Sequence, residues 1–276
     1  MISSMRGSAL LLALLITSVV VILGSFLAVY LHAEMQFSER LADRDAARLA
    51  TQTALAWAMQ WLPQHHASIP QLPAQFHVSN QQTILDAHLS DAQARFNLNR
   101  LTQPEGVNAL RHLLLGTTQR TDACEPFLQA ARQMIQQQAR VDAYTDATSV
   151  SLLAQKTFPD LAVKKLFITL PLNTPVNMNS VSWPVLLSLS PQITPAMAQA
   201  LVQIRQDVKG FRHLAQVQAY WQRWGLSSAQ AMTLSSDYFL LQVQVKRAQH
   251  HLHRQLLLAY NGRAKAKVRV LWVREE

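Results

Sequence analysis

The sequence predicts an α+β protein in which one long N-terminal helix packs on an antiparallel sheet, with a large all-helical domain inserted. Three observations predict this fold. An uncharged apolar stretch near the N-terminus runs on into an amphipathic segment over 34–62. Helical periodicity fills 100–235. Strand-like runs lie on both sides of that region, at 76–89 and at 236–273, so the insert separates early strands from late ones.

The apolar stretch is long enough to cross a membrane. No Asp, Glu, Lys or Arg occurs between Arg6 and Glu34, and Leu10–Leu31 is almost wholly aliphatic. A bilayer core is spanned by roughly 20 helical residues, whereas the core of a cleaved secretory signal has about 7 to 15. We therefore expect a single transmembrane helix that remains as an anchor.

The helix is predicted to continue beyond the membrane. From Glu34 to Leu62 there is no Pro or Gly, and charges are interspersed; Pro63 is the first expected stop. One helix over 8–62 would be about 80 Å long at the usual rise per residue. Small residues recur at helical spacing, and we expect this stripe to lie on the globular part: Ala42, Ala46, Leu49, Thr53 and Ala56.

The strands and the insert are predicted from turn and capping signals. Runs at 76–78 and 83–89 flank a polar turn, and the late runs at 236–245, 253–260 and 266–273 include the hairpin signal Asn261-Gly262. In the insert, Pro104 suits the first turn of a helix. The pair Thr194-Pro195 is expected to act as N-cap and first residue of another helix.

The N-terminal residues carry a resemblance. Met5-Arg6-Gly7-Ser8, followed directly by the apolar helix and its amphipathic continuation, resembles type IV pilins and the pseudopilins of type II secretion. The resemblance implies that a prepilin peptidase cuts between Gly7 and Ser8 and methylates the new N-terminus. Most members carry Glu at the fifth mature position, where it is thought to pair with a neighbouring subunit's terminal amine. Here that position is Leu12, which is similar to the minor pseudopilin K, thought to cap the tip.

Three further stretches resemble pseudopilin K. Arg95-Phe96-Asn97-Leu98-Asn99 follows an acidic turn in which Ala94 replaces the usual Gly. From the residues alone we expect the side chains of Asn97 and Asn99 to satisfy backbone groups ahead of a helix. The other two stretches are 174–211, which resembles the insert of helix-hairpin-helix character, and Ser-Asp-Tyr-Phe from Ser236.

The resemblance implies a domain organisation and a function. The expected parts are a leader over 1–7, a transmembrane helix over 8–32, an amphipathic helix with first strands over 33–99, an inserted helical domain over 100–235 and C-terminal strands over 236–276. The function implied is that of a minor pseudopilin at the tip of the type II secretion pseudopilus, initiating its assembly and supporting protein export across the outer membrane.

The implied partners are other minor pseudopilins, prepilin peptidase and the inner-membrane secretion platform. The implied location is the inner membrane, crossed once, with a short cytoplasmic N-terminus and a periplasmic C-terminal domain. Calcium is implied as a candidate cofactor by resemblance only. Asp122, Asp142 and Asp146 lack the alternate-residue spacing of an EF-hand, so no ligand set can be carried over and any metal site is unknown.

Nucleic-acid binding is the main alternative. The net charge of +9 and the helix-hairpin-helix character of the insert favour a membrane-anchored nucleic-acid-binding protein. Against it, the hairpin at 190–193 has no Gly and contains Pro191, whereas a phosphate-binding hairpin uses Gly for close backbone approach. The alternation of Arg263, Lys265, Lys267 and Arg269 with apolar residues predicts a cationic strand face, either solvated or fitted to an acidic patch on a partner.

Catalysis finds little support in the sequence. Cys124 is the only cysteine and has acidic neighbours, which disfavour a thiolate. His112 and His213 lie in no visible nucleophile arrangement, and the adjacent His65 and His66 are typical of an exposed loop rather than of a zinc site, which needs three or four ligands. We predict no enzyme, while a signal-anchored enzyme of unknown chemistry remains a third hypothesis.

Overall fold

The computed structural model describes residues 5–65, 73–80, 83–118, 120–138, 148–161, 163–227, 231–247, 250–262 and 267–275. Its helices are α1 (Met5–His65), α2 (Pro104–Thr117), α3 (Thr121–Gln138), α4 (Thr148–Thr157), α5 (Val163–Leu166), α6 (Trp183–Leu186), α7 (Pro195–Asp207) and α8 (Leu214–Arg223). Its strands are β1 (Ala74–Ser79), β2 (Thr83–Asp91), β3 (Phe96–Asn97), β4 (Phe167–Ile168), β5 (Val176–Asn177), β6 (Met232–Thr233), β7 (Tyr238–Arg247), β8 (His250–Ala259) and β9 (Arg269–Glu275).

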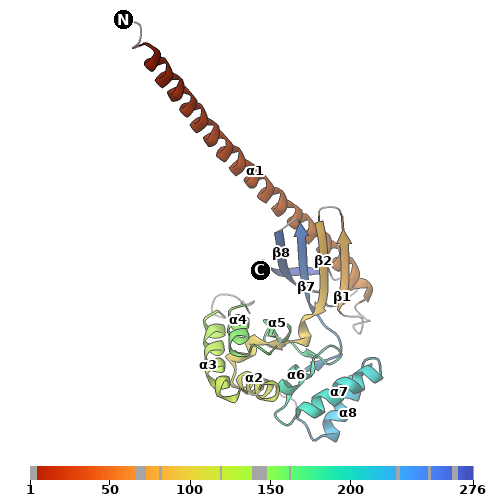
Figure 1. The fold of residues 1–276 in the computed structure, drawn as a ribbon. Helices are drawn as coiled ribbons and strands as arrows, with labels where there is room; N and C mark the ends of the chain where they lie inside the picture. Colours follow the sequence, from red (N-terminus) through yellow and green to blue (C-terminus); the bar gives the residue numbers. More distant parts are fainter. Residues whose placement is uncertain are drawn as a thin grey trace.

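One antiparallel sheet and one helical body make up the globular part (Figure 1). The strand order is β1-β2-β7-β8-β9, and every neighbouring pair is antiparallel. The chain leaves the sheet after β2 and returns at β7, which pairs directly with β2, so the whole helical body is inserted between two adjacent strands. The predicted α+β fold is confirmed.

Helix α1 is longer than predicted at both ends. It has 61 residues, about 90 Å at 1.5 Å per residue, and Pro63 lies inside its last turn instead of ending it. A side chain supports that turn: His65 stacks on Trp61 at a ring distance of 4.4 Å, and its Nδ1 lies 3.0 Å from the Trp61 carbonyl oxygen. The missing N–H of Pro63 therefore does not end the helix.

The face that α1 lays on the sheet differs from the predicted stripe. Ala50, Ala54, Ala58 and Leu62 are buried in one apolar cluster with β2, β7 and β8. Ala47 and Thr51 on the same helix are buried as well. Leu49 is 63% exposed, and Ala42, Thr53 and Ala56 are exposed as well. Ala46 is half-buried, so the predicted stripe as a whole was wrong. The two stripes differ by about one residue, or 100° around the helix. Large side chains determine which of the two stripes faces the sheet. Trp57 flanks the observed stripe and stacks on Phe76 of β1, with 5.3 Å between the ring centroids.

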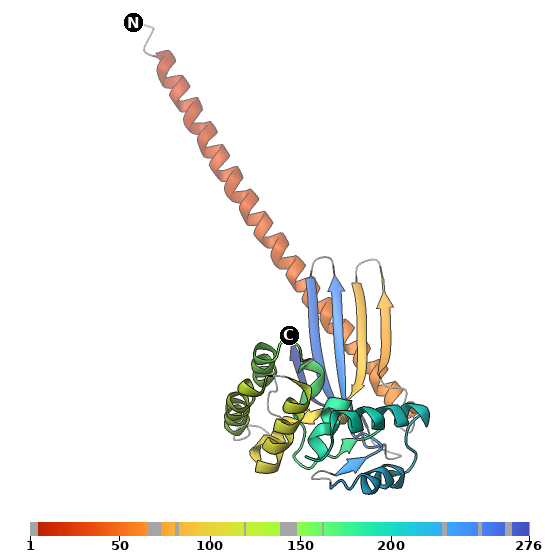
Figure 2. The same cartoon turned by 60° about the horizontal axis from the view of Figure 1, so that its bottom comes forward.

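The inserted body has its own apolar core. Helices α2, α3, α4, α6, α7 and α8 contribute to one buried cluster that is separate from the cluster under α1. Two short parallel pairs, β3 with β4 and β5 with β6, connect distant parts of the insert. Figure 2 shows this body gathered at the end of the sheet that lies away from the N-terminal end of α1. The Pro104 and Thr194-Pro195 predictions are confirmed, and Thr194 Oγ1 accepts a hydrogen bond from Met197 N.

The last strand begins later than predicted. Strand β9 starts at Arg269, whereas the sequence pattern indicated Ala266. Arg263 and Lys265 lie outside the described residues, and Lys267 precedes the strand. Of the two predicted cations that the structure describes, Arg269 therefore lies within the strand and Lys267 does not. The reason lies in the pairing: the register with β8 ends at Ala259 opposite Arg269, and Gly262, three residues beyond Ala259, has a left-handed backbone conformation.

Two glycines of α2 give a stability prediction. A Cβ at Gly106 would collide with the backbone carbonyl of Arg100, whereas a Cβ at Gly116 would meet only the flexible end of Leu187, at 2.6 Å. We expect Gly106→Ala to lower the free energy of unfolding by about 3 kcal/mol, since backbone cannot move aside as a side chain can. Gly116→Ala, the control on the same helix, is expected to cost less than about 1 kcal/mol. Urea unfolding of the full chain in detergent measures both, and equal losses would contradict this packing.

Candidate assembly surface

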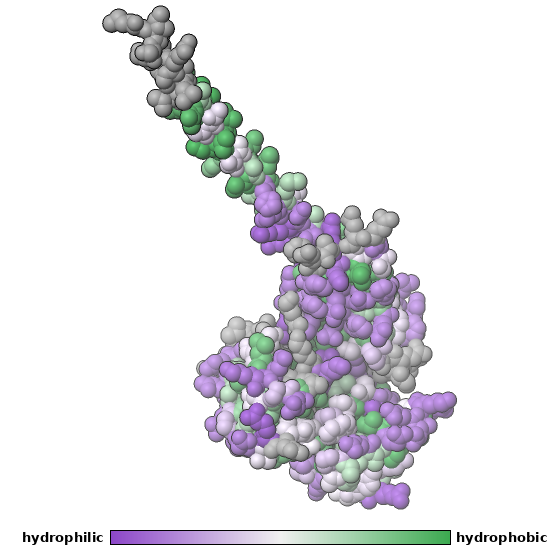
Figure 3. Space-filling view, in the orientation of Figure 1, coloured by the Kyte–Doolittle hydropathy of each residue, from purple (hydrophilic) through white to green (hydrophobic). Residues whose placement is uncertain are grey.

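The N-terminal half of α1 is uncovered. Every residue described from Leu12 to Ala42 is exposed, and Leu12 itself has 63% of its surface exposed. Among the described residues, α1 is the one helix long and apolar enough to cross a membrane. Figure 3 shows the apolar surface along this part of α1, followed by a polar band before the sheet. An apolar helix surface of this extent must be covered by lipid or by other helices.

The predicted processing residues lie at the start of the same helix. Gly7 and Ser8 fall within the first turns of α1, and Leu12 follows one turn later. The first N–H groups of a helix have no partner within it, so these turns are its weakest. Between Arg6 and Glu34 the helix carries no Asp, Glu, Lys or Arg. The structure thus places the three predicted residues on one helix, and Leu12 among them is exposed.

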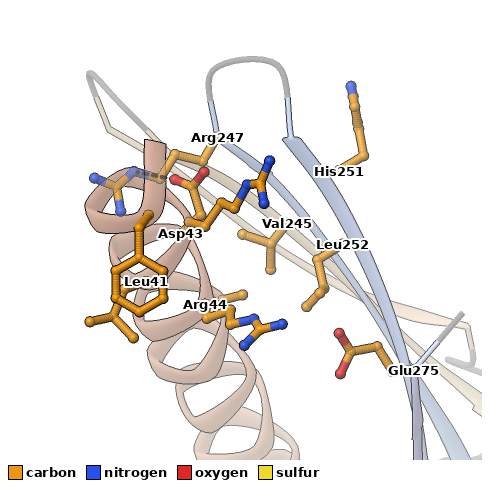
Figure 4. A pocket seen from close by; sticks show the side chains of 11 residues that line it. Leu41, Asp43, Arg44, Val245, Arg247, His251, Leu252 and Glu275 are labelled. Atoms are coloured by element: carbon orange, nitrogen blue, oxygen red, sulfur yellow. Dashed lines mark ion pairs between the residues drawn. The ribbon is translucent and has the colours of Figure 1, made fainter. Parts of the chain in front are cut away.

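An arginine of β7 links the sheet to α1 at the point where the helix leaves the sheet. Arg247, at the end of β7, donates from Nη1 to the carbonyl oxygen of Ala42 at 2.8 Å, and its Nε lies 3.4 Å from Asp43 Oδ1. Figure 4 shows this contact at the mouth of a groove of about 500 Å³ between α1 and strands β7 and β8, with Leu41 and Leu252 among its apolar lining. Sequence reasoning missed the contact between Arg247 and Ala42, because 205 residues separate them.

A buried carboxylate joins the sheet to the insert. Asp91, the last residue of β2, accepts hydrogen bonds from Gln93 N at 2.7 Å, from Asn177 Nδ2 at 2.7 Å and from the Ser180 hydroxyl. Burial raises the pKa of Asp91 above its usual range, and hydrogen bonds from Ser180 and Ser236 oppose this rise. One carboxylate thus connects β2 to β5 and to the segment that leads back into β7.

Asn97 and Asn99 satisfy backbone groups, as predicted, and Asn179 of the second motif does the same. Asn97 Oδ1 accepts from Asn99 N at 3.1 Å and from Leu170 N at 3.0 Å. Asn99 Nδ2 donates to Leu170 O at 2.8 Å. Asn179 Oδ1 accepts from Phe211 N at 2.8 Å. These side chains link the start of the insert to its middle, so the motif residues are structural.

The helix-hairpin-helix segment does not offer its backbone to a phosphate. In the hairpin before α7, Ile193 N donates to Ser190 O at 3.2 Å and Gln192 N lies 3.4 Å from Ser190 Oγ. Ser190 and Ile193 are also buried. Amides engaged inside the fold are unavailable as an anion-binding nest, which argues against the nucleic-acid alternative at this hairpin.

Within the part of the chain that the structure describes, no group of three or more His, Cys, Asp or Glu side chains is placed to hold a metal ion. The donors around Asp91 are N–H and O–H groups, so this carboxylate is arranged as a hydrogen-bond acceptor. Asp142 and Asp146 lie outside the described residues, as does His66. Cys124 is buried, and burial is the main cause that raises the pKa of its thiol, with Glu125 adding to it.

The fold and the uncovered helix together define a class: a pilin-like, membrane-anchored protein that carries a helical insert. Residues 176–238 match the model of the family described as Type II secretion system (T2SS), protein K. The matched segment runs from β5 to the start of β7 and so contains the hairpin, α7 and α8.

A solved structure shares the fold over most of the chain. A chain in the crystal structure of the GspK-GspI-GspJ complex from the enterotoxigenic Escherichia coli Type 2 Secretion System matches with a TM-score of 0.60 at 17% sequence identity. The match covers 87% of this chain and 99% of that chain. No sequence among the curated proteins matches. The resemblance to minor pseudopilin K is confirmed by the family match and the structural match together.

Proposed function

We propose that this protein is the minor pseudopilin that occupies the tip of the type II secretion pseudopilus and initiates its assembly in support of protein export. The observation that carries the proposal is the uncovered α1 with Leu12, 63% exposed, where most pilins carry a carboxylate. Without that carboxylate, the helix offers nothing to the terminal amine of a subunit above it. This property favours a subunit at the top of the pseudopilus, which has neighbours below and beside it but none above.

The bulk of the insert supports the same position. It is attached at the end of the sheet away from the N-terminal end of α1 (Figures 1 and 2). A body of this size above the sheet would obstruct a subunit stacked on top, whereas it is accommodated at a tip. As part of the proposal we retain the division into a leader over 1–7, an anchor over 8–32, a pilin-like domain formed by 33–99 and 236–276, and an insert over 100–235.

The proposal includes a route into the membrane. Prepilin peptidase removes the leader at Gly7 and methylates Ser8, and the secretion platform of the inner membrane receives the processed chain with its globular part in the periplasm. Other minor pseudopilins are the proposed partners within the tip, which is supported by the GspK-GspI-GspJ complex in which the matching chain was solved.

Leu12→Glu tests the tip assignment. The variant regains the charge that ordinary subunits carry, so we expect normal leader removal but a loss of export of about tenfold, equivalent to about 1.4 kcal/mol in the tip equilibrium. Leu12→Gln is the matched control, because it is polar and of similar size but uncharged. Secretion assays and pseudopilus lengths by electron microscopy provide the readout. If export and length match the unaltered chain, the argument from Leu12 fails.

A further inference from the structure

The groove between α1 and strands β7 and β8 lies at the membrane end of the globular part. Figures 1 and 2 show the end of β7 and the start of β8 beside α1, at the end of the sheet nearest the N-terminal half of the helix. Glu34 is the first charged residue after the apolar stretch. Two residues that line the groove follow it along the helix, Phe37 at about 4 to 5 Å and Arg44 at about 15 Å. Because the headgroup layer of a bilayer is roughly 5 to 8 Å deep, one end of the groove lies at the depth of the headgroups.

The apolar surface of the helix continues into this groove. Phe37 is 67% exposed and Leu41 is 52% exposed, and the two lie one turn apart on the same side of α1. Val245 of β7 and Leu252 of β8 belong to the lining as well, and Figure 4 shows them on the strand side of the groove, opposite α1. An acyl chain that lies along α1 in the bilayer can therefore extend into the groove without losing apolar contact.

The two carboxylates that line the groove are both paired with arginines. Asp43 Oδ1 lies 3.4 Å from Nε of Arg247. Glu275 Oε2 lies 3.1 Å from Nη2 of Arg254. Each carboxylate of the lining is thus neutralised by an arginine, one from β7 and one from β8.

Two further arginines of the lining have no such partner. Among the described residues, the side chains of Arg40 and Arg44 form no ion pair and no hydrogen bond. Figure 4 shows Arg44 extended from α1 into the groove. His251 adds a ring that can donate a hydrogen bond, whereas Glu39 and Asp45, the neighbouring acids of α1, do not belong to the lining. Three arginines and two carboxylates therefore line the groove, which has excess positive charge beside its apolar part.

An anionic phospholipid matches both properties of the groove. Arginine is well suited to phosphate, because its planar guanidinium donates two parallel N–H groups to phosphate oxygens. Basic pockets beside membrane helices bind acidic lipid headgroups in the same way. The acyl chains of the same molecule are chemically suited to Phe37 and Leu41. An acidic peptide would satisfy the two arginines but would have to displace lipid from these two side chains.

We propose that this groove binds one anionic phospholipid from the leaflet at the C-terminal end of the membrane span, with the phosphate at Arg40 and Arg44 and an acyl chain along Phe37 and Leu41. This inference goes beyond the proposed function, since it requires only that α1 is anchored in a membrane. The bound lipid connects the β7–β8 side of the sheet to the bilayer surface. It therefore fixes the orientation of the globular part relative to the membrane for as long as the span stays in lipid.

Lipid retention tests the proposal directly. The full chain is purified in detergent micelles that contain equal amounts of phosphatidylglycerol and phosphatidylcholine, and native mass spectrometry counts the lipids that stay bound. We expect one phosphatidylglycerol to be retained about tenfold more often than phosphatidylcholine, because only the first carries a net negative charge to the two arginines. An excess of inorganic phosphate is expected to leave this lipid in place, since phosphate has no apolar part.

Helix α1 offers two matched pairs of variants at exposed positions. Arg44 lines the groove and Arg48, one turn further on, does not. We expect Arg44→Gln to lower phosphatidylglycerol retention about fivefold and Arg48→Gln to leave it unchanged, since both lose one positive charge but only the first loses it at the phosphate. Leu41 lines the groove and Leu49 does not. Leu41→Gln is expected to lower retention several-fold through lost apolar contact, whereas Leu49→Gln is expected to have no effect.

Three results would overturn the lipid site. Equal retention of the two lipids, or equal losses for Arg44→Gln and Arg48→Gln, would show that lipid is held only around the span. Displacement of phosphatidylglycerol by inorganic phosphate would identify a site for small anions instead. If Arg44→Gln and Leu41→Gln left lipid retention unchanged but reduced the co-purification of other minor pseudopilins, the occupant of the groove would be a neighbouring subunit. In each case the proposed tip position and leader removal would stand, because neither depends on lipid in this groove.

Discussion

Gly7→Leu is expected to abolish leader removal when the chain is co-expressed with a prepilin peptidase, leaving residues 1–7 attached in nearly every molecule. The bond after Gly7 lies in the first turn or two of α1. To be cut, this segment must unwind and lie close to the peptidase, and a residue without a Cβ permits both. A leucine favours the helix by about 0.5 to 1 kcal/mol and adds bulk at the cleaved bond.

The intact mass of the purified chain is the measurement. The unaltered chain is expected to begin at Ser8, with or without a methyl group. Gly24→Leu is the matched control on the same helix, because a Cβ there meets nothing within 4 Å, and it should be processed normally. Normal processing of Gly7→Leu, or an uncut Met1 in the unaltered chain beside a control pilin that is cut, would remove the processing step from the proposal.

The second large effect is expected at the joint between the sheet and the insert. Asp91→Ala leaves Gln93 N, Asn177 Nδ2 and the Ser180 hydroxyl without their acceptor in a buried site. Because each unpaired buried donor costs about 1 to 3 kcal/mol, we expect a loss of about 4 kcal/mol in the free energy of unfolding. Asp86→Ala is the control on the same strand. Asp86 is 43% exposed beside His77, so its loss is expected to cost less than about 1 kcal/mol.

The raised pKa of Asp91 also predicts how the free energy of unfolding changes with pH. Because burial raises the pKa of Asp91, the folded chain holds a proton between pH 3.8, the ordinary value, and its own higher pKa, while the unfolded chain has released it. The unfolded state therefore binds fewer protons in this window, and the contribution of Asp91 to stability falls as pH rises through it. Asp91→Asn removes this slope. Denaturant unfolding of both chains at several pH values checks the difference, and parallel curves would contradict a raised pKa.

Local periodicity accounts for what the sequence could predict. The apolar stretch before Glu34, the hairpin signal at Asn261-Gly262 and the caps at Pro104 and Thr194 act within a few residues, so α1 and much of the α+β architecture follow from them. The wrong stripe on α1 shows what local periodicity does not determine. Ala46 and Ala47 start equally regular helical series, and only packing against Phe76 and the sheet selects the second.

The parts of the site that escaped prediction depend on contacts between distant residues. The acidic turn before Arg95, to which Asp91 belongs, was recognisable in the sequence, yet the partners of Asp91, Asn177 and Ser180, lie 86 and 89 residues away. Arg247 reaches Ala42 across 205 residues. No sequence pattern marks such pairs. In contrast, Gly7, Ser8 and Leu12 lie within one short segment, so the resemblance could place them while the fold was still unknown.

The uncovered half of α1 determines how this subunit can move. Transferring Leu, Ile, Val or Phe from a bilayer to water costs about 0.3 to 0.6 kcal/mol per residue, so extracting the span alone would cost on the order of 5 to 10 kcal/mol. At about 1.4 kcal/mol per factor of ten, a solitary helix would almost never leave the lipid. Outward movement therefore requires neighbouring apolar helices to replace lipid contacts as they are lost. In the proposed pseudopilus, the same exposed side chains that anchor the subunit would therefore make its departure from the membrane a collective event.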